Sequence, residues 1–277
     1  MNWWYFLVGS LRRFVPRSWL FTIMRWRGDG SLAESFPAKY AMDNWRERLA
    51  QHQLSIDGKR ILEIGSGRYA RQAVYWIAAG AQAVALIDLY AAPLSHVPHR
   101  RMLEKDCALL GLHLDDVLPR IQVIQGDFTR LAYSDTARQF DLVLSSSVLE
   151  HVYDPQLVFT ACWHWLKPGG ATYHMIDLRD HNLSFRYPFE MLTFSDNVWN
   201  RWLDLRAGFH LNRWRLPHYL SAMHQVGFRS VHSEPAACDM AGLHAVYPRL
   251  QPQYREFDPA ALSVLTLYLY GEKPGVA

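Results

Sequence analysis

Residues 60–70 of this chain read Arg-Ile-Leu-Glu-Ile-Gly-Ser-Gly-Arg-Tyr-Ala, an apolar run that ends in a glycine-rich turn. Residues 72–79 follow with a helix-forming composition, and Gly80 comes next as a residue that ends helices. The apolar segment 83–87 then ends on the acidic Asp88. This order predicts a strand–helix–strand unit whose glycines let the backbone approach a ligand closely.

The glycine turn fits two classes of cofactor. The turn at 65–67, followed by Ala70, satisfies the dinucleotide pattern, and Asp88 lies where an acid binds ribose hydroxyls. Glu63 argues against a nicotinamide dinucleotide, because a carboxylate in the same pocket repels a pyrophosphate. Glu63 instead favours a cationic cofactor that carries no phosphate.

Later segments continue the pattern. Gly-Asp-Phe at 126–128 closes an apolar run, residues 140–152 read Phe-Asp-Leu-Val-Leu-Ser-Ser-Ser-Val-Leu-Glu-His-Val, and Lys-Pro-Gly-Gly follows at 167–170. Together with the first turn, these segments resemble the class I S-adenosylmethionine-dependent methyltransferases over residues 62–175. The resemblance implies a Rossmann-like α/β fold with a seven-stranded, mostly parallel sheet whose last strand is antiparallel. It also implies a helix ahead of the last two strands, which we place at 216–226.

The resemblance further implies a cofactor, S-adenosylmethionine, and the residues that bind it. By this resemblance the glycine loop holds the methionine moiety, Asp88 the ribose and Asp127 the adenine amino group. Tyr69 stands where the family often has a third glycine, so the pocket for the methionine tail is expected to be narrower. The predicted cofactor-binding residues are Glu63, Gly65, Ser66, Gly67, Asp88, Leu89, Asp127, Phe128, Ser145 and Ser146.

Catalysis of methyl transfer consists largely of positioning the acceptor and the methyl donor. A base is needed only where the acceptor must lose a proton. Acidic and histidine side chains lie at the end of the predicted fifth strand at 171–178 and just after it, namely Asp177, Asp180 and His181. We predict His181 and Asp180 as catalytic residues. Each of them is equally suited to capping a helix or anchoring the loop.

Two parts of the chain lie outside the core pattern. We predict a helical segment at 1–52 ahead of a methyltransferase-like domain at 53–277, with cap insertions at about 179–215 and 236–260. The first insertion is rich in aromatic residues, which fits either a water-excluding lid or a small core of its own. Residues 1–28 contain five arginines and no acid, with apolar residues at helical spacing. That segment is expected to cover the active site or to contact a membrane surface.

Composition limits the remaining possibilities. The chain has 277 residues and a net charge of +3, from 29 basic and 26 acidic residues, which does not indicate a nucleic-acid partner. Three scattered cysteines indicate a reduced, cytoplasmic protein. His96-x-x-His99 has no third ligand near it, so no metal is expected. The oligomeric state stays open.

We therefore predict methyl transfer to an oxygen or nitrogen of a small molecule. A rival chemistry keeps the fold but uses S-adenosylmethionine as the substrate, whose amino group attacks its own γ-carbon to close an azetidine ring and release methylthioadenosine. The aromatic residues and the scarcity of bases fit that chemistry. An NAD(P)-dependent oxidoreductase, which Glu63 disfavours, and a non-catalytic binding module are the two remaining hypotheses.

Overall fold

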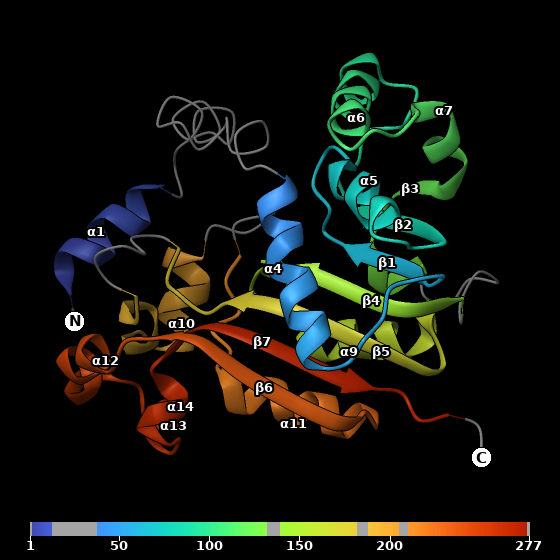
Figure 1. The fold of residues 1–277 in the computed structure, drawn as a ribbon. Helices are drawn as coiled ribbons and strands as arrows, with labels where there is room; N and C mark the ends of the chain where they lie inside the picture. Colours follow the sequence, from blue (N-terminus) through green and yellow to red (C-terminus); the bar gives the residue numbers. More distant parts are fainter. Residues whose placement is uncertain (1, 13–37, 132–138, 182–187, 205–209, 276–277) are drawn as a thin grey trace.

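The computed structural model describes residues 2–12, 38–131, 139–181, 188–204 and 210–275. Its centre is a seven-stranded sheet with the strand order β3-β2-β1-β4-β5-β7-β6 (Figure 1). Strands β1 to β5 run parallel, and β7 runs antiparallel to both β5 and β6. The strands are β1 (Arg60–Ile64), β2 (Ala83–Asp88), β3 (Ile121–Gln125), β4 (Phe140–Ser146), β5 (Leu166–Asp177), β6 (Arg229–Cys238) and β7 (Val264–Glu272). The predicted fold class is confirmed.

Helices cover both faces of the sheet because its central strands β1, β2 and β4 are buried on both sides. Ile61 of β1 packs in a core with α4, α5 and α6, whereas its neighbour Leu62 packs in a second core with α8, α9 and α11. These helices are α4 (Ala38–Gln51), α5 (Arg71–Ala78), α6 (Val97–Leu109), α8 (Phe128–Leu131), α9 (Pro155–Trp165) and α11 (Leu216–Val226). The bounds of α11 are those predicted for the helix ahead of the last two strands.

Shorter helices complete the described chain. Between β2 and β5 lie α7 (Leu114–Val117), η1 (Leu118–Arg120) and η2 (Leu149–His151). The segments after β5 and β6 form η3 (Glu190–Thr193), α10 (Asp196–Val198), the π-helical η4 (Trp199–Leu203), α12 (Met240–Val246), η5 (Tyr247–Arg249), α13 (Pro252–Arg255) and α14 (Pro259–Leu262). The N-terminal helix is α1 (Trp3–Arg12).

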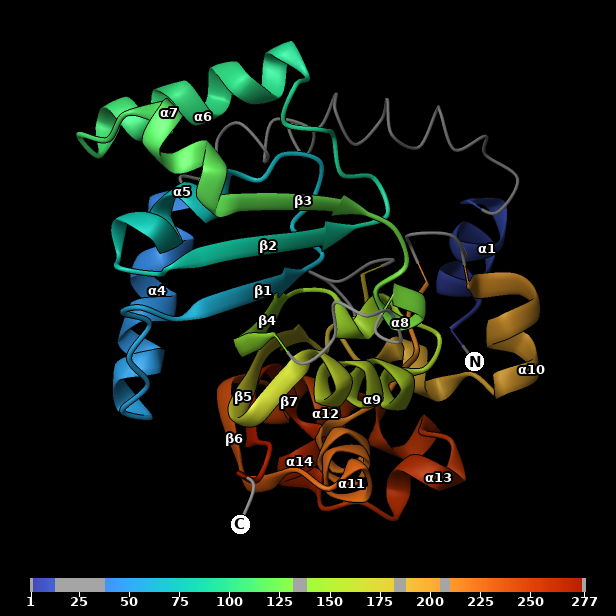
Figure 2. The same ribbon diagram turned by 90° about the vertical axis from the view of Figure 1, so that its right-hand side faces the viewer.

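A third core joins α1 to the two segments after β5 and β6. Tyr5 of α1 is fully buried there, together with Phe189, Phe194 and Trp199. Figure 2 shows α1 and α10 beyond the carboxyl ends of the parallel strands. Phe189, Phe194 and Trp199 are thus part of a core of aromatic and aliphatic residues, whereas Trp202 is 40% exposed. Phe185, Tyr187 and Phe209 lie outside the described residues.

Candidate active site

The glycine turn follows β1 at the edge where the parallel strands end. Ile64 pairs with Ile87 of β2 on one side and with Ser145 of β4 on the other, so the ends of three strands meet here. Gly65 has φ +71°, and a Cβ atom on it would lie 2.2 Å from Val148 Cγ2. Only glycine fits this position, because a side chain would both strain the backbone and overlap Val148.

Asp88 is tied to the glycine turn by backbone hydrogen bonds. The amide of Gly67 donates to Oδ2 of Asp88 at 2.9 Å, and the amide of Tyr90 donates to Oδ1 at 2.7 Å. A carboxylate accepts about four hydrogen bonds, so two lone-pair positions remain for a ligand. The geometry suits an acid that binds the two hydroxyls of a ribose beside the glycine loop.

Glu63 is a buried carboxyl group directly before that loop. Its side chain is 6% exposed, and Nε1 of Trp76 donates to Oε2 at 3.2 Å. Burial raises the pKa of Glu63 to about 7, and the hydrogen bond from Trp76 offsets only part of that rise. A nearby cation stabilises the ionised form, so this group favours a positively charged ligand.

Three more of the predicted cofactor-binding residues, Asp127, Phe128 and Leu89, differ in what their side chains contact. Asp127 accepts hydrogen bonds from the amide of Thr129 at 3.0 Å and from its hydroxyl at 2.7 Å, and thereby holds the turn that begins α8. Phe128 is 6% exposed and stacks on Trp165 inside the core, whereas Leu89 is 57% exposed. Leu89 thus offers an accessible apolar surface next to Asp88.

The two serines at the end of β4 point in different directions. Ser145 is 1% exposed, and its hydroxyl lies 2.7 Å from Nδ1 of His174 in a buried network that also contains Thr172. Burial lowers the pKa of His174 to about 3, so this imidazole is neutral. Ser146 is the next residue of the strand and faces the other way, because side chains alternate along a strand. Ser66, the remaining predicted residue, is buried in the glycine turn.

His99 supports the loop, a role that its sequence context did not indicate. Its Nε2 accepts a hydrogen bond from the amide of Ala70 at 2.8 Å, and Nδ1 donates to the carbonyl of Ala92 at 3.0 Å. The ring of Tyr69 lies 5.5 Å from the His99 ring, so it leans towards α6. Within the described ranges, no group of three or more His, Cys, Asp or Glu side chains is placed to hold a metal ion.

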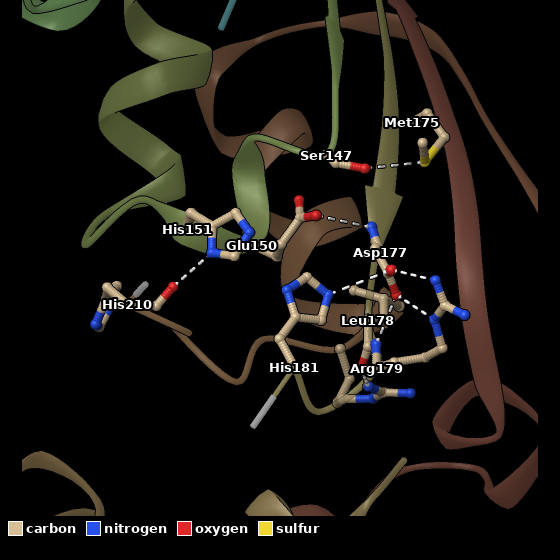
Figure 3. A network of polar contacts seen from close by, with 10 residues as sticks. Ser147, Glu150, His151, Met175, Asp177, Leu178, Arg179, His181 and His210 are labelled. Atoms are coloured by element: carbon tan, nitrogen blue, oxygen red, sulfur yellow. Dashed lines mark hydrogen bonds and ion pairs between the residues drawn. The ribbon is translucent and has the colours of Figure 1, made fainter. Parts of the chain in front are cut away.

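A second polar cluster lies where β5 ends (Figure 3). Oδ1 of Asp177 accepts a hydrogen bond from Nε of Arg179 at 2.8 Å, and Oδ2 lies 3.3 Å from Nε2 of His181. Burial on its own would raise the pKa of Asp177, but Arg179 and His181 together hold that pKa well below its usual range. Asp177 is therefore ionised and faces His181.

Helix η2 adds a histidine and a carboxyl group to this cluster. Nδ1 of His151 donates to the carbonyl of His210 at 2.8 Å, which leaves Nε2 with its lone pair, and the His151 and His181 rings are 4.9 Å apart. Burial and then His181 lower the pKa of His151 to about 4, so it is neutral. The pairing of His151 with His181 was not predicted, because it joins residues 30 positions apart.

Glu150 lies beside His151 and points to β5. It is 3% exposed, and its Oε1 accepts a hydrogen bond from the amide of Asp177 at 3.4 Å. Among the described residues, Oε2 has no hydrogen-bond partner. Burial raises the pKa of Glu150 well above its usual value, which favours the protonated form of the carboxyl group.

Asp180 is placed differently from His181, although the two are neighbours in sequence. Asp180 is fully buried and accepts hydrogen bonds from the hydroxyl of Tyr5 and, at 3.0 Å, from the amide of Met191. These contacts connect the end of β5 to α1 and η3. The structure thus brings His181 together with Asp177 and His151, while Asp180 faces the third core.

A cavity of ≈ 480 Å³ lies next to this cluster. Tyr153 and His210 form part of its wall and stack at 4.0 Å between ring centroids. Asn212 also lines the cavity, and its side-chain amide donates to the carbonyl of Leu149 at the start of η2. The cavity therefore borders η2 through two of its lining residues, since His210 and Asn212 hydrogen-bond to His151 and Leu149, and its volume is that of a small-molecule site.

A family model described as a methyltransferase domain matches residues 36–233, which is more than half of the chain. This chain belongs to the class I S-adenosylmethionine-dependent methyltransferases. The ubiquinone biosynthesis O-methyltransferase of Pasteurella multocida is 29% identical over 132 residues, which are 45% of this chain and 49% of that protein. The protein of the same name from Pseudomonas putida GB-1 is 30% identical over 130 residues, 47% of each. This methyltransferase thus spans about half the length of the curated relatives it matches.

Solved structures share the fold of this methyltransferase. Phosphoethanolamine N-methyltransferase 2 of Haemonchus contortus, in complex with S-adenosyl-L-methionine, aligns with a TM-score of 0.51 and 18% identity, covering 83% of this chain and 53% of that one. An S-adenosylmethionine-dependent methyltransferase from Mesorhizobium loti aligns with a TM-score of 0.50 and 19% identity, covering 82% of this chain and 96% of that one. At these identities the likeness concerns the fold.

The residues of this methyltransferase fit S-adenosylmethionine, which supplies an activated methyl group on a sulfonium cation. Glu63 would supply a buried carboxyl group for the ammonium group of this cofactor, and Asp88 would accept hydrogen bonds from its ribose hydroxyls. The space beside Gly67 is open, because a Cβ on this residue would meet nothing within 4 Å. A ligand can therefore approach the backbone of the loop closely. Because S-adenosylmethionine carries no phosphate group, the site needs no residues that bind phosphate.

The raised pKa of Glu63 predicts that the free energy of unfolding of the methyltransferase without its cofactor depends on pH. Its pKa rises from 4.5 in the unfolded chain to about 7 in the fold, so the stabilising protonated state is complete below about pH 4.5 and is lost as the pH rises through about 7. We expect on the order of 3 kcal/mol to be lost across this window. Denaturant unfolding of the parent and of Glu63→Gln between pH 5 and pH 8, roughly that window, measures it.

The glutamine variant supplies the control, because it cannot ionise. Its free energy of unfolding should change much less over the same range, and saturating S-adenosylmethionine should flatten the parent's curve, because the bound cation favours the carboxylate. Equal pH dependence in the parent and in Glu63→Gln would show that Glu63 does not ionise in this window.

Proposed function

We propose that this chain is a cytoplasmic enzyme that transfers the methyl group of S-adenosylmethionine to a hydroxyl oxygen of a small molecule, with nitrogen as the alternative acceptor atom. The observation that carries the proposal is the pair formed by His181 and Asp177 at the end of β5. A hydroxyl acceptor must lose its proton as the new O–C bond forms and the S–C bond breaks. A histidine backed by a carboxylate is a suitable base for that proton.

The chain's own residues have distinct parts in this proposal. With Nε2 of His181 only 3.3 Å from Oδ2 of Asp177, Nδ1 is the ring nitrogen that takes the acceptor's proton, and the ionised Asp177 stabilises the resulting imidazolium. His151 is a neutral neighbour whose Nε2 accepts a hydrogen bond from the acceptor. Asp180 is a positioning residue in this account, because its contacts with Tyr5 and Met191 hold the segment that bears His181.

The two sites are adjacent through η2. Val148, which fills the space beside Gly65 of the cofactor loop, lies two residues before Glu150. The cavity beyond η2 has the size of a small-molecule site and mixes aromatic with polar side chains, such as Tyr153 and Asn212. The curated relatives named as O-methyltransferases support an oxygen acceptor. The cofactor-binding residues predicted above, from Glu63 to Ser146, are part of this proposal.

The experiment that tests the function is mass spectrometry of the nucleosides formed from S-adenosylmethionine, with and without a metabolite extract. Methyl transfer predicts S-adenosylhomocysteine only when the extract is present. Methylthioadenosine formed without extract, above the spontaneous background, would instead establish the intramolecular cyclisation. No product together with tight NAD(P) binding would indicate an oxidoreductase, and no product together with tight S-adenosylhomocysteine binding would indicate a binding module.

A further inference from the structure

Helix α1 has one face packed on the protein and one face in water. On the packed face, Tyr5 is fully buried, stacks on Phe194 with ring centroids 5.2 Å apart, and donates a hydrogen bond to Asp180. Gly9 lies against Leu203 of η4. The exposed face consists of large apolar side chains, with exposed fractions of 70% for Trp3, 61% for Trp4, 52% for Leu7 and 57% for Leu11.

These four exposed residues form one continuous surface. Residues 3, 7 and 11 follow one another at the spacing of a helical turn, and residue 4 adjoins them, so all four lie within an arc of about 100°. Residues 2–11 contain no charged side chain. A contiguous exposed surface of this kind marks an interaction site, whereas apolar residues scattered singly do not.

The charge of the surrounding sequence identifies the partner. Residues 1–28 contain five arginines and no acid, while the whole chain carries only +3. Tryptophan and leucine enter the boundary between headgroups and acyl chains, and arginines close by in sequence attract anionic headgroups. Within the part of the chain that the structure describes, no helix is long and apolar enough to cross a bilayer.

We propose that α1 docks this methyltransferase on the surface of an anionic phospholipid bilayer through Trp3, Trp4, Leu7 and Leu11. This inference goes beyond the proposed reaction and does not depend on it. Attachment through α1 also places the catalytic end near the membrane. On the packed face of α1, Tyr5 contacts Asp180, the residue before His181. Docking therefore holds the acceptor cluster at the end of the molecule that meets the membrane.

Co-sedimentation of the full chain with vesicles tests the proposal. We expect at least about tenfold stronger binding to phosphatidylcholine vesicles that contain about 30% phosphatidylglycerol than to vesicles of phosphatidylcholine alone. Salt should weaken this binding, because it screens the arginines. The double variant Trp3→Ser with Trp4→Ser should bind the anionic vesicles about tenfold more weakly or worse, because two large apolar side chains no longer leave water.

The matched control removes exposed apolar surface elsewhere. Val97 and Leu109 on α6 are 59% and 78% exposed, and both views place α6 away from α1 (Figures 1 and 2). Val97→Ser with Leu109→Ser should bind the vesicles like the parent. S-adenosylhomocysteine affinity, measured by calorimetry, should be unchanged in both double variants and so excludes misfolding. Equal vesicle binding by the parent and the α1 variant, or a dimer that only the α1 variant disrupts, would overturn the proposal.

Discussion

Replacing His181 with alanine is expected to lower kcat for methyl transfer by about 10² to 10⁴-fold, the usual contribution of a general base. The reason is that a hydroxyl acceptor would then keep its proton as the methyl group arrives. Binding of S-adenosylhomocysteine should stay within about twofold of the parent, because His181 belongs to the cluster at the end of β5 and not to the glycine loop. Single-turnover kinetics with the identified acceptor, together with calorimetry for the cofactor product, measure the two effects.

Three further variants distinguish a base from a structural residue. Asp177→Asn keeps the volume but removes the charge that stabilises the imidazolium, so it should lower kcat by a smaller factor than His181→Ala. His224 on α11 is exposed and outside the site, so His224→Ala should have the parent's kcat. If His181→Ala keeps full activity and His151→Ala loses it, the base is His151, and the assignment to His181 is wrong.

Replacing Asp88 with alanine is expected to weaken binding of S-adenosylmethionine and S-adenosylhomocysteine by about 100-fold or more. Hydrogen bonds to a charged group contribute about 1.5–3 kcal/mol each, and the two ribose hydroxyls would lose their acceptor together. The amides of Gly67 and Tyr90 would lose their acceptor as well, which loosens the loop that holds the ligand. Isothermal titration calorimetry with S-adenosylhomocysteine provides the measurement.

The control for Asp88 is an acid outside the site. Asp116 on α7 is exposed and belongs to neither the glycine turn nor the cluster at the end of β5, so Asp116→Ala should bind the ligand like the parent. Thermal unfolding of the Asp88→Ala variant without ligand separates loss of binding from loss of folding. Parent-like affinity in a folded Asp88→Ala protein would place the ribose elsewhere and refute the assignment of the cofactor site.

The cofactor half of the candidate site was largely accessible to sequence reasoning. The turn at 65–67 and the acid at Asp88 lie in one strand–turn–helix–strand unit, so their proximity follows from local geometry. The acceptor half was less accessible. His181 was predicted, but its neighbours His151 and Glu150 come from a different strand connection, and only the pairing of β4 with β5 brings them together. The motif Leu-Glu-His-Val at 149–152 was the available signal, and it does not specify which side chains face the acceptor.

By itself, the sequence determined the α/β fold of this protein, its alternation of strands and helices, and the glycine loop. These features depend on periodicity and on backbone angles, which neighbouring residues set. The tertiary structure decided where individual side chains point. Ser145 bonds to His174, Phe128 stacks on Trp165, and Asp180 accepts a hydrogen bond from Tyr5, 175 residues away. Those outcomes depend on which distant groups can satisfy a buried polar atom or fill a core, and only packing determines that.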